Sequence, residues 1–196
     1  MRRRLTSLVA GAALSAMMAS AAAAHPHVFI DNRLTFSFTD GEVTSFQTDW
    51  RFDEIFTEDL LSQFDADGDK QFSAAESEQV KEGTLPNLEA FRYFTYVYLD
   101  GRDLGEMAPS GFIADVVDGS VRFRLTYQLP RPVDPHQTKL AVSIYDQEYY
   151  VEVQLAEKAP VAVEGTAVCQ GQVADDPAHA YFGGFVVPQL VTVVCP

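Results

Sequence analysis

The sequence predicts a mainly β protein, an antiparallel β-sandwich with an α-helical, EF-hand-like insertion. Three observations lead to this prediction. Short runs in which apolar and polar residues alternate recur between residues 34 and 194. Turn signals such as the Asp-Gly pairs at 100–101 and 118–119 separate these runs. Between residues 53 and 92 the apolar spacing becomes helical, so we expect one domain, residues 25–196, with a helical insertion at 53–92.

The expected strands follow the alternation along the chain. The first two, 34–38 and 43–50, flank a turn at 39–42 and form a hairpin. The later ones are an aromatic run at 93–99 and the runs 121–127, 140–144, 151–155, 161–163 and 190–194. Strands of this length and spacing are typical of a sandwich or an open barrel.

The insertion is expected to hold two helices and a further short turn. Apolar residues between 52 and 64 recur at helical spacing and predict the first helix. Ser73 and Glu76 have the spacing of a capping box, which predicts the start of a second helix. This polar helix is expected to stop near Gly83, and another helical turn is expected at 86–91.

The segment 65–76 between these helices has the ligand spacing of an EF-hand calcium loop. Such loops place ligands at positions 1, 3, 5, 7, 9 and 12, because Ca²⁺ takes six to eight oxygen ligands. The predicted calcium ligands are Asp65, Asp67, Asp69, the backbone carbonyl of Gln71, Ser73 and Glu76. Phe72 supplies the apolar anchor at position 8. The alternative is an acidic, solvated loop without an ion.

Position 6 of this loop departs from the usual pattern. The chain turns sharply there with positive φ, so glycine is the usual residue, but this sequence has Lys70. A left-handed conformation at Lys70 costs about 1 kcal/mol. We therefore expect weakened calcium binding and a structural role for the ion.

The first 24 residues have the pattern of a cleaved secretory signal. Three arginines at 2–4 precede a short apolar region at 5–18, and Ala22–Ala24 provides small residues for cleavage before His25. The apolar region is shorter than the roughly 20 residues that span a bilayer. The sequence therefore predicts an exported, periplasmic protein that is not embedded in the membrane.

Charge and cysteine content narrow the functional classes. The chain has 14 basic and 28 acidic residues. Removal of residues 1–24 would leave 11 basic and 28 acidic residues, a net charge of −17. Such a surface repels nucleic acid and suits cations. The two cysteines, Cys169 and Cys195, predict one disulfide in an exported chain, with a two-thiol metal site as the alternative.

Cleavage before His25 would place two histidines and a free amine at the new chain start. His25 and His27 would lie on one face of a strand, and imidazole suits zinc, nickel, cobalt and copper. A square-planar clamp on the histidine at position 3 needs a backbone N–H at position 2, which Pro26 lacks. A brace formed by the amine and ring of His25 remains open. His27, His136 or His179 could complete it, together with a carboxylate such as Asp31 or Asp146, or both histidines could be exposed polar residues.

Several segments together resemble a known family. They are HPHVFID at 25–31, WRFDEIF at 50–56, FDADGD at 64–69, NLEAFRYFT at 87–95, VYLDG at 97–101 and SIYDQEYY at 143–150, with the two late cysteines. The chain resembles a family of bacterial periplasmic proteins catalogued as a domain of unknown function. Its members are often labelled the periplasmic component of an uncharacterised ABC-type transport system. The resemblance implies export and an association with metal transport.

These observations favour a periplasmic metal-binding accessory protein that is not an enzyme. It would handle a transition metal at His25 and His27 for an inner-membrane metal transporter, and calcium would stiffen its helical insertion. The alternative is a calcium-stabilised module without a transition metal, whose tyrosine-rich segment at 145–150 contacts a protein partner. A third hypothesis is an enzyme with a copper brace.

Overall fold

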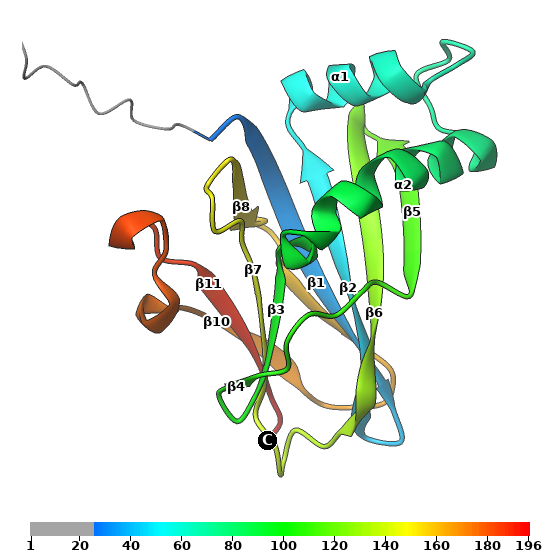
Figure 1. Cartoon of the computed structure of the whole chain (residues 1–196). Coiled ribbons are helices and arrows are strands. Elements are labelled where there is room, and N and C mark those ends of the chain that lie inside the picture. Colours follow the sequence, from blue (N-terminus) through cyan, green and yellow to red (C-terminus); the bar gives the residue numbers. More distant parts are fainter. Residues whose placement is uncertain (1–25) are drawn as a thin grey trace, which may run out of the picture.

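The structure, a computed structural model, describes residues 26–196 and consists mainly of β-strands in two sheets (Figure 1). The prediction of a mainly β protein is confirmed. The signal segment and His25 lie outside the described residues. Among residues 26–196, no helix is long and apolar enough to cross a membrane.

The first sheet has six strands. Its strands are β1 (Val28–Thr39), β2 (Glu42–Phe52), β5 (Gly111–Val117), β6 (Ser120–Val133), β8 (Val151–Leu155) and β9 (Val161–Glu164). The order is β5-β6-β2-β1-β8, and β9 also pairs with β1. The pairs β1–β2, β2–β6 and β5–β6 are antiparallel as expected, whereas β1–β8 and β1–β9 are parallel, so the sheet is mainly but not wholly antiparallel. The chain leaves the second sheet after residue 144 and returns to the first sheet as β8 and β9, which both run in the same direction as β1.

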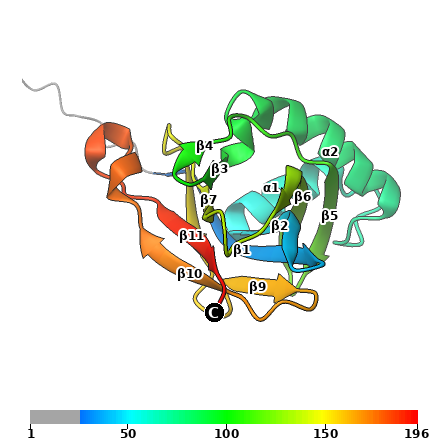
Figure 2. The same ribbon diagram turned by 90° about the horizontal axis from the view of Figure 1, so that it is seen from below.

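The second sheet has five strands, all paired antiparallel. In sheet order they are β10 (Gln170–Asp175), β11 (Gln189–Val194), β7 (Leu140–Ile144), β3 (Thr95–Leu99) and β4 (Arg102–Asp103). Two short 3-10 turns, η2 (Pro177–His179) and η3 (Phe182–Gly184), connect β10 to β11. Figure 2 shows the two sheets facing each other.

One apolar core joins the sheets, and the alternation in the sequence explains it. Every second residue of β1 is buried, and Phe36 of β1 is fully covered. Phe36 shares one buried cluster with Phe46 of the same sheet and with Val142 and Val191 of the opposite sheet. The two inner faces therefore pack together as a sandwich requires.

The helical segment follows β2 and lies over the first sheet (Figure 1). It contains α1 (Glu54–Phe64), α2 (Ala74–Glu89) and the turn η1 (Arg92–Phe94). The predicted capping box at the start of α2 is present. The prediction that α2 stops near Gly83 is wrong, because the helix continues through Pro86 to Glu89. Pro86 lies in the last turn, where its missing N–H leaves one carbonyl without a helical partner.

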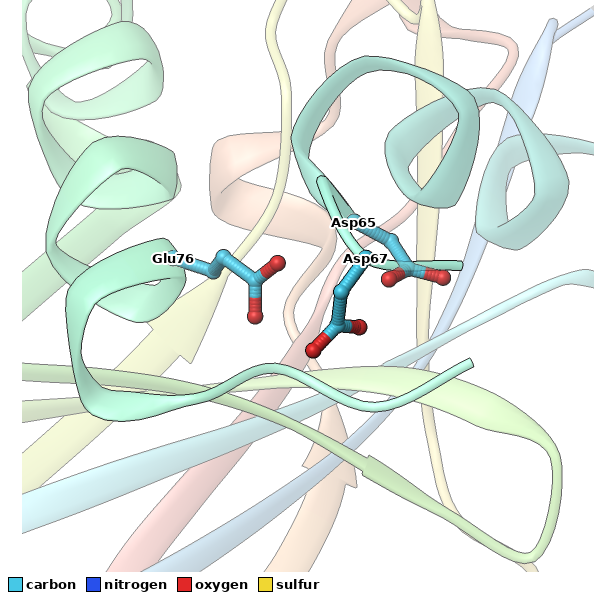
Figure 3. Close-up of side chains that lie close together, drawn as sticks. All are labelled: Asp65, Asp67 and Glu76. Atoms are coloured by element: carbon cyan, nitrogen blue, oxygen red, sulfur yellow. The ribbon is translucent and has the colours of Figure 1, made fainter. Parts of the chain in front are cut away.

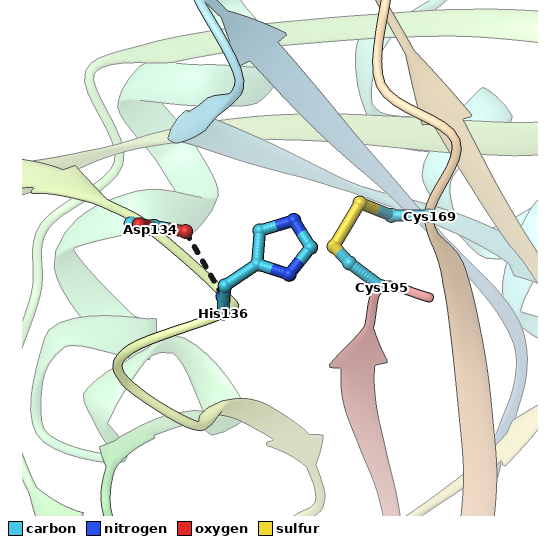
Figure 4. Close-up of a disulfide and its surroundings, with 4 residues drawn as sticks. All are labelled: Asp134, His136, Cys169 and Cys195. Atoms are coloured by element: carbon cyan, nitrogen blue, oxygen red, sulfur yellow. Dashed lines mark hydrogen bonds between the residues drawn. A yellow bond between two sulfur atoms is a disulfide. The ribbon is translucent and has the colours of Figure 1, made fainter.

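A disulfide joins Cys169 and Cys195, so the predicted bridge is confirmed and the two-thiol metal site is excluded. The bond connects the segment before β10 to the residue after β11, across a sequence separation of 26. It thereby ties the two strands at one edge of the second sheet. Figure 4 shows the ring of His136 beside this disulfide.

Candidate metal centre

Three carboxylates converge in the loop between α1 and α2. Asp65 ends α1, Asp67 lies in the loop, and Glu76 lies in the first turn of α2. One oxygen from each lies within 4.8 Å of the others. Figure 3 shows the three side chains around a common space. These are positions 1, 3 and 12 of the predicted calcium loop.

Backbone hydrogen bonds to Asp65 shape this loop. The N–H groups of Gly68 and Lys70 donate to its two carboxylate oxygens, each at 2.9 Å. Lys70 has φ of 62°, so position 6 adopts the left-handed conformation for which glycine is favoured. The sequence predicted a left-handed turn at this position, and the structure shows that Lys70 adopts it.

Glu76 is held by the loop that it closes. The N–H of Ser73 donates to Oε2 at 2.8 Å, and the N–H of Ala66 donates to Oε1 at 2.7 Å. Hydrogen bonds from Ser73 and Ala66 hold the pKa of the Glu76 carboxyl below its ordinary value. The side chain is buried. An ionised carboxylate therefore faces Asp65 and Asp67 across a short distance, an arrangement that a cation would neutralise.

The other predicted ligands lie in the same loop but outside the cluster of three. The Asp69 carboxylate accepts the N–H of Gln71 at 2.7 Å, and the Ser73 hydroxyl accepts the N–H of Glu76 at 3.3 Å. The Gln71 side-chain amide donates to the carbonyl of Lys70. Phe72 packs against the main core, as the apolar anchor was expected to do.

The candidate transition-metal ligands are placed separately. His27 is exposed, its N–H donates to the carbonyl of Tyr150 at 2.8 Å, and the two rings lie 4.9 Å apart. Among residues 26–196, the acidic cluster is the one group of three metal-ligating side chains close enough to share an ion. His25 lies outside the described residues, so the predicted brace stays a prediction.

Three residues that could have joined His27 have other neighbours. His136 is exposed in the turn after β6, where its N–H donates to Asp134. His179 has its Nδ1 2.7 Å from Asp176 and its ring 4.8 Å from the ring of Tyr98. Asp146 is buried and accepts three backbone N–H groups of the turn that leads to β8.

The tyrosine-rich segment 145–150 is only partly available to a partner. Tyr145 is buried and stacks on Tyr96, with ring centroids 4.1 Å apart, and on Tyr181 at 4.9 Å. Tyr150, in contrast, is 58% exposed. Of these two side chains, Tyr150 is the one that a partner could contact directly.

Sequence reasoning missed an apolar cavity between the helical segment and the first sheet. Its walls include six phenylalanines, Phe52, Phe56, Phe64, Phe91, Phe94 and Phe123. The sequence indicated one of these walls, the apolar face of α1, through the helical spacing of residues 56, 60 and 64. The remaining walls come from segments far apart in the sequence.

The fold and this loop define a β-rich protein with a helical segment and an acidic inter-helical loop. The chain belongs to a family described as "Protein of unknown function (DUF1007)", whose model matches residues 10–180. It is 32% identical over 131 residues to an "Uncharacterized 15.5 kDa protein in trpE 3'region" of Spirochaeta aurantia. That alignment covers 66% of this chain and 93% of the relative.

Proposed function

We propose that this chain is an exported calcium-binding protein, in which an EF-hand-like loop at 65–76 holds one Ca²⁺ ion. The convergence of Asp65, Asp67 and Glu76 at the spacing of positions 1, 3 and 12 carries this proposal. Asp69, the carbonyl of Gln71 and Ser73 would complete the oxygen ligands. The acidic chain, with a net charge of −14, favours cation binding.

The proposed role of calcium is to fix the helical segment on the β core. Each helix already bonds to the first sheet through one hydroxyl group. The Thr57 hydroxyl of α1 accepts the N–H of Val121 at 3.1 Å, and the Ser77 hydroxyl of α2 accepts the N–H of Ala114 at 2.8 Å. An ion bound between the end of α1 and the start of α2 would fix the two helices relative to each other and so keep both hydrogen bonds to the sheet. This role agrees with the alternative hypothesis from the sequence, a calcium-stabilised binding module.

Thermal unfolding with and without calcium tests the proposal. At a calcium concentration about a hundredfold above Kd, we expect the Tm of the chelator-treated protein to rise by about 5–10 °C. Glu76→Gln should lose this rise, because an amide cannot act as a bidentate anionic ligand, although glutamine keeps the capping box. Glu78→Gln is the matched control, since Glu78 lies on the same helix, is exposed, and pairs with Lys81.

Isothermal titration of calcium into the same proteins gives the stoichiometry. One site in the wild type and in Glu78→Gln, and none in Glu76→Gln, would support the proposal. Equal calcium stabilisation of both variants would show that the loop is a solvated acidic turn.

Export is part of the proposal, because the Cys169–Cys195 disulfide suits an oxidising compartment. Handling of a transition metal for a membrane transporter is the second candidate. The exposure of His27, two residues after His25, favours it. Secreted protein should begin at His25 by intact mass and carry about one equivalent of zinc, nickel, cobalt or copper. His25→Ala/His27→Ala should lose that metal while calcium remains, and calcium alone in both proteins would exclude this candidate.

A further inference from the structure

The apolar cavity beneath the helical segment has the size and lining of a ligand site. Its volume is about 340 Å³. Pockets for small molecules typically measure about 300–1,000 Å³ and are lined mainly by apolar and aromatic side chains. α1 and α2 form one side of this cavity, and strands β1, β2, β6 and β8 contribute to the other. Figure 1 shows α2 crossing β2 and β6.

Trp50 gives the cavity an apolar wall and no accessible hydrogen-bond donor. Its side chain lines the cavity and is 1% exposed. The indole Nε1–H has no hydrogen-bond partner within the described part of the chain. Buried donors nearly always have a partner, because an unpaired one keeps its full desolvation cost. The nitrogen atom itself is buried, and Asn32, the cross-strand neighbour of Trp50, also has an unpartnered buried side chain, so the missing partner is not reached from the cavity.

The charge around the cavity restricts what it can bind. Neither lysine nor arginine occurs among the residues that line it, and Asp59 contributes a carboxylate. Asp59, Gln63 and Asn87 are exposed and form a polar rim. An anion would enter an apolar site without a cationic partner, next to a carboxylate, in a chain of net charge −14. These features favour an uncharged molecule.

Gly83 explains how the wall of the cavity is built. It lies inside α2, where glycine is less favourable than alanine by about 1 kcal/mol. A Cβ atom at this position would lie 2.9 Å from Cζ of Phe64, which also lines the cavity. The absence of a side chain lets the Phe64 ring lie against α2.

We propose that this cavity binds an uncharged apolar molecule. The proposal goes beyond calcium binding and does not depend on it. The volume of the cavity, its aromatic walls and the lack of a lining cation are the observations that carry it.

Prodan, an uncharged naphthalene with one ketone, is a suitable probe because its emission reports both polarity and hydrogen bonding. Trp50 is the single tryptophan of the chain, so energy transfer from it to prodan places the bound probe near the cavity. We expect saturable transfer with one site, in calcium and in chelator alike.

Two phenylalanine substitutions on α2 separate the cavity from the rest of the helix. Thr84 lines the cavity, so Thr84→Phe should fill it and weaken prodan binding by at least about tenfold. Gln79 is exposed on α2 away from the cavity, so Gln79→Phe adds the same ring and should leave binding unchanged. Circular dichroism and thermal unfolding confirm that both variants fold. Displacement of prodan by decanol but not by decanoate tests the preference for an uncharged ligand.

Equal prodan affinity in Thr84→Phe and the wild type would overturn the proposal, as would an absence of transfer from Trp50. If Thr84→Phe does not fold, the proposal is tested by the displacement of prodan from the wild type by decanol and by decanoate. Equal displacement of prodan by the two compounds would contradict the proposal. A dimer that Thr84→Phe dissociates, without prodan binding, would show that the cavity accepts a second copy of the chain and would also overturn it. Loss of calcium binding alone leaves these expectations unchanged.

Discussion

Removal of the Asp146 carboxylate is expected to be among the most damaging single substitutions in the described chain. This buried side chain holds the turn from β7 to β8. Its Oδ1 accepts the N–H of Glu148 at 3.0 Å, and its Oδ2 accepts those of Tyr150 and Val151 at 2.9 and 3.0 Å. The carbonyl of Tyr150 in turn accepts the N–H of His27. The same carboxylate therefore positions the start of β1.

The magnitude follows from what each donor meets in Asp146→Ala. The N–H groups of Glu148 and Tyr150 lie in an exposed turn and can bond to water, so each loss costs about 1 kcal/mol. Val151 is buried, and its unpaired N–H carries a desolvation cost of about 1–3 kcal/mol. We therefore expect a loss of about 3–5 kcal/mol in the free energy of unfolding, and a Tm lower by roughly 10 °C.

Urea unfolding of Asp146→Ala and Asp134→Ala, with the disulfide intact, tests this reasoning. Asp134 also holds a turn, since it accepts the N–H of His136 and the amide of Gln137, but its donors are exposed. Asp134→Ala should lose much less stability, because water replaces the carboxylate. Equal losses with unchanged m-values would refute the argument that burial makes Asp146 costly to remove.

Three further predictions concern the disulfide, the calcium loop and the buried tyrosines. Cys169→Ala/Cys195→Ala should lower the free energy of unfolding by about 3–4 kcal/mol in urea titrations, since the bridge spans a separation of 26; no change would contradict this. Lys70→Gly should bind calcium a few-fold more tightly by isothermal titration, because it removes left-handed strain and a positive charge; weaker binding would contradict this. Burial raises the pKa of Tyr96 to about 12, and it also raises that of Tyr127. Because the folded state favours the neutral phenols, their contribution to stability is full below pH of about 10 and falls as the pH rises toward 12. Thermal unfolding at about pH 8 and 11 should therefore give a lower Tm at the higher pH, and equal Tm values would disprove this prediction.

Strands with one buried face could be predicted from the sequence, and an exposed strand such as β10 could not. The alternation at 34–38 matches β1 because Leu34 and Phe36 face the core while their neighbours do not. β10 was missed because its residues are nearly all exposed, so no apolar alternation marks it. The strands β8 and β9 were predicted, but their parallel pairing with β1 was not, because alternation fixes which face is buried and says nothing about strand direction.

The acidic loop was predictable because its chemistry is local. Asp65, Asp67 and Glu76 lie within 12 consecutive residues, and the capping box at Ser73 fixes where α2 begins. The cavity was not predictable, because Trp50 and Phe64 meet there with residues near 90, 123 and 151. Such a site depends on how distant elements pack, and hydrophobic periodicity carries no information about that.

The parallel pairing of β1 has a consequence for the order in which the chain can fold. β1 is the first strand to leave the ribosome, and its partner β2 follows immediately. Its other edge must wait, because Val28 pairs with Val151, which is synthesised 123 residues later. Until then β1 exposes an unpaired edge, and long-range pairing of this kind is slow to form. Segment 151–164, which supplies β8 and β9, therefore completes the first sheet and ends this period of exposure.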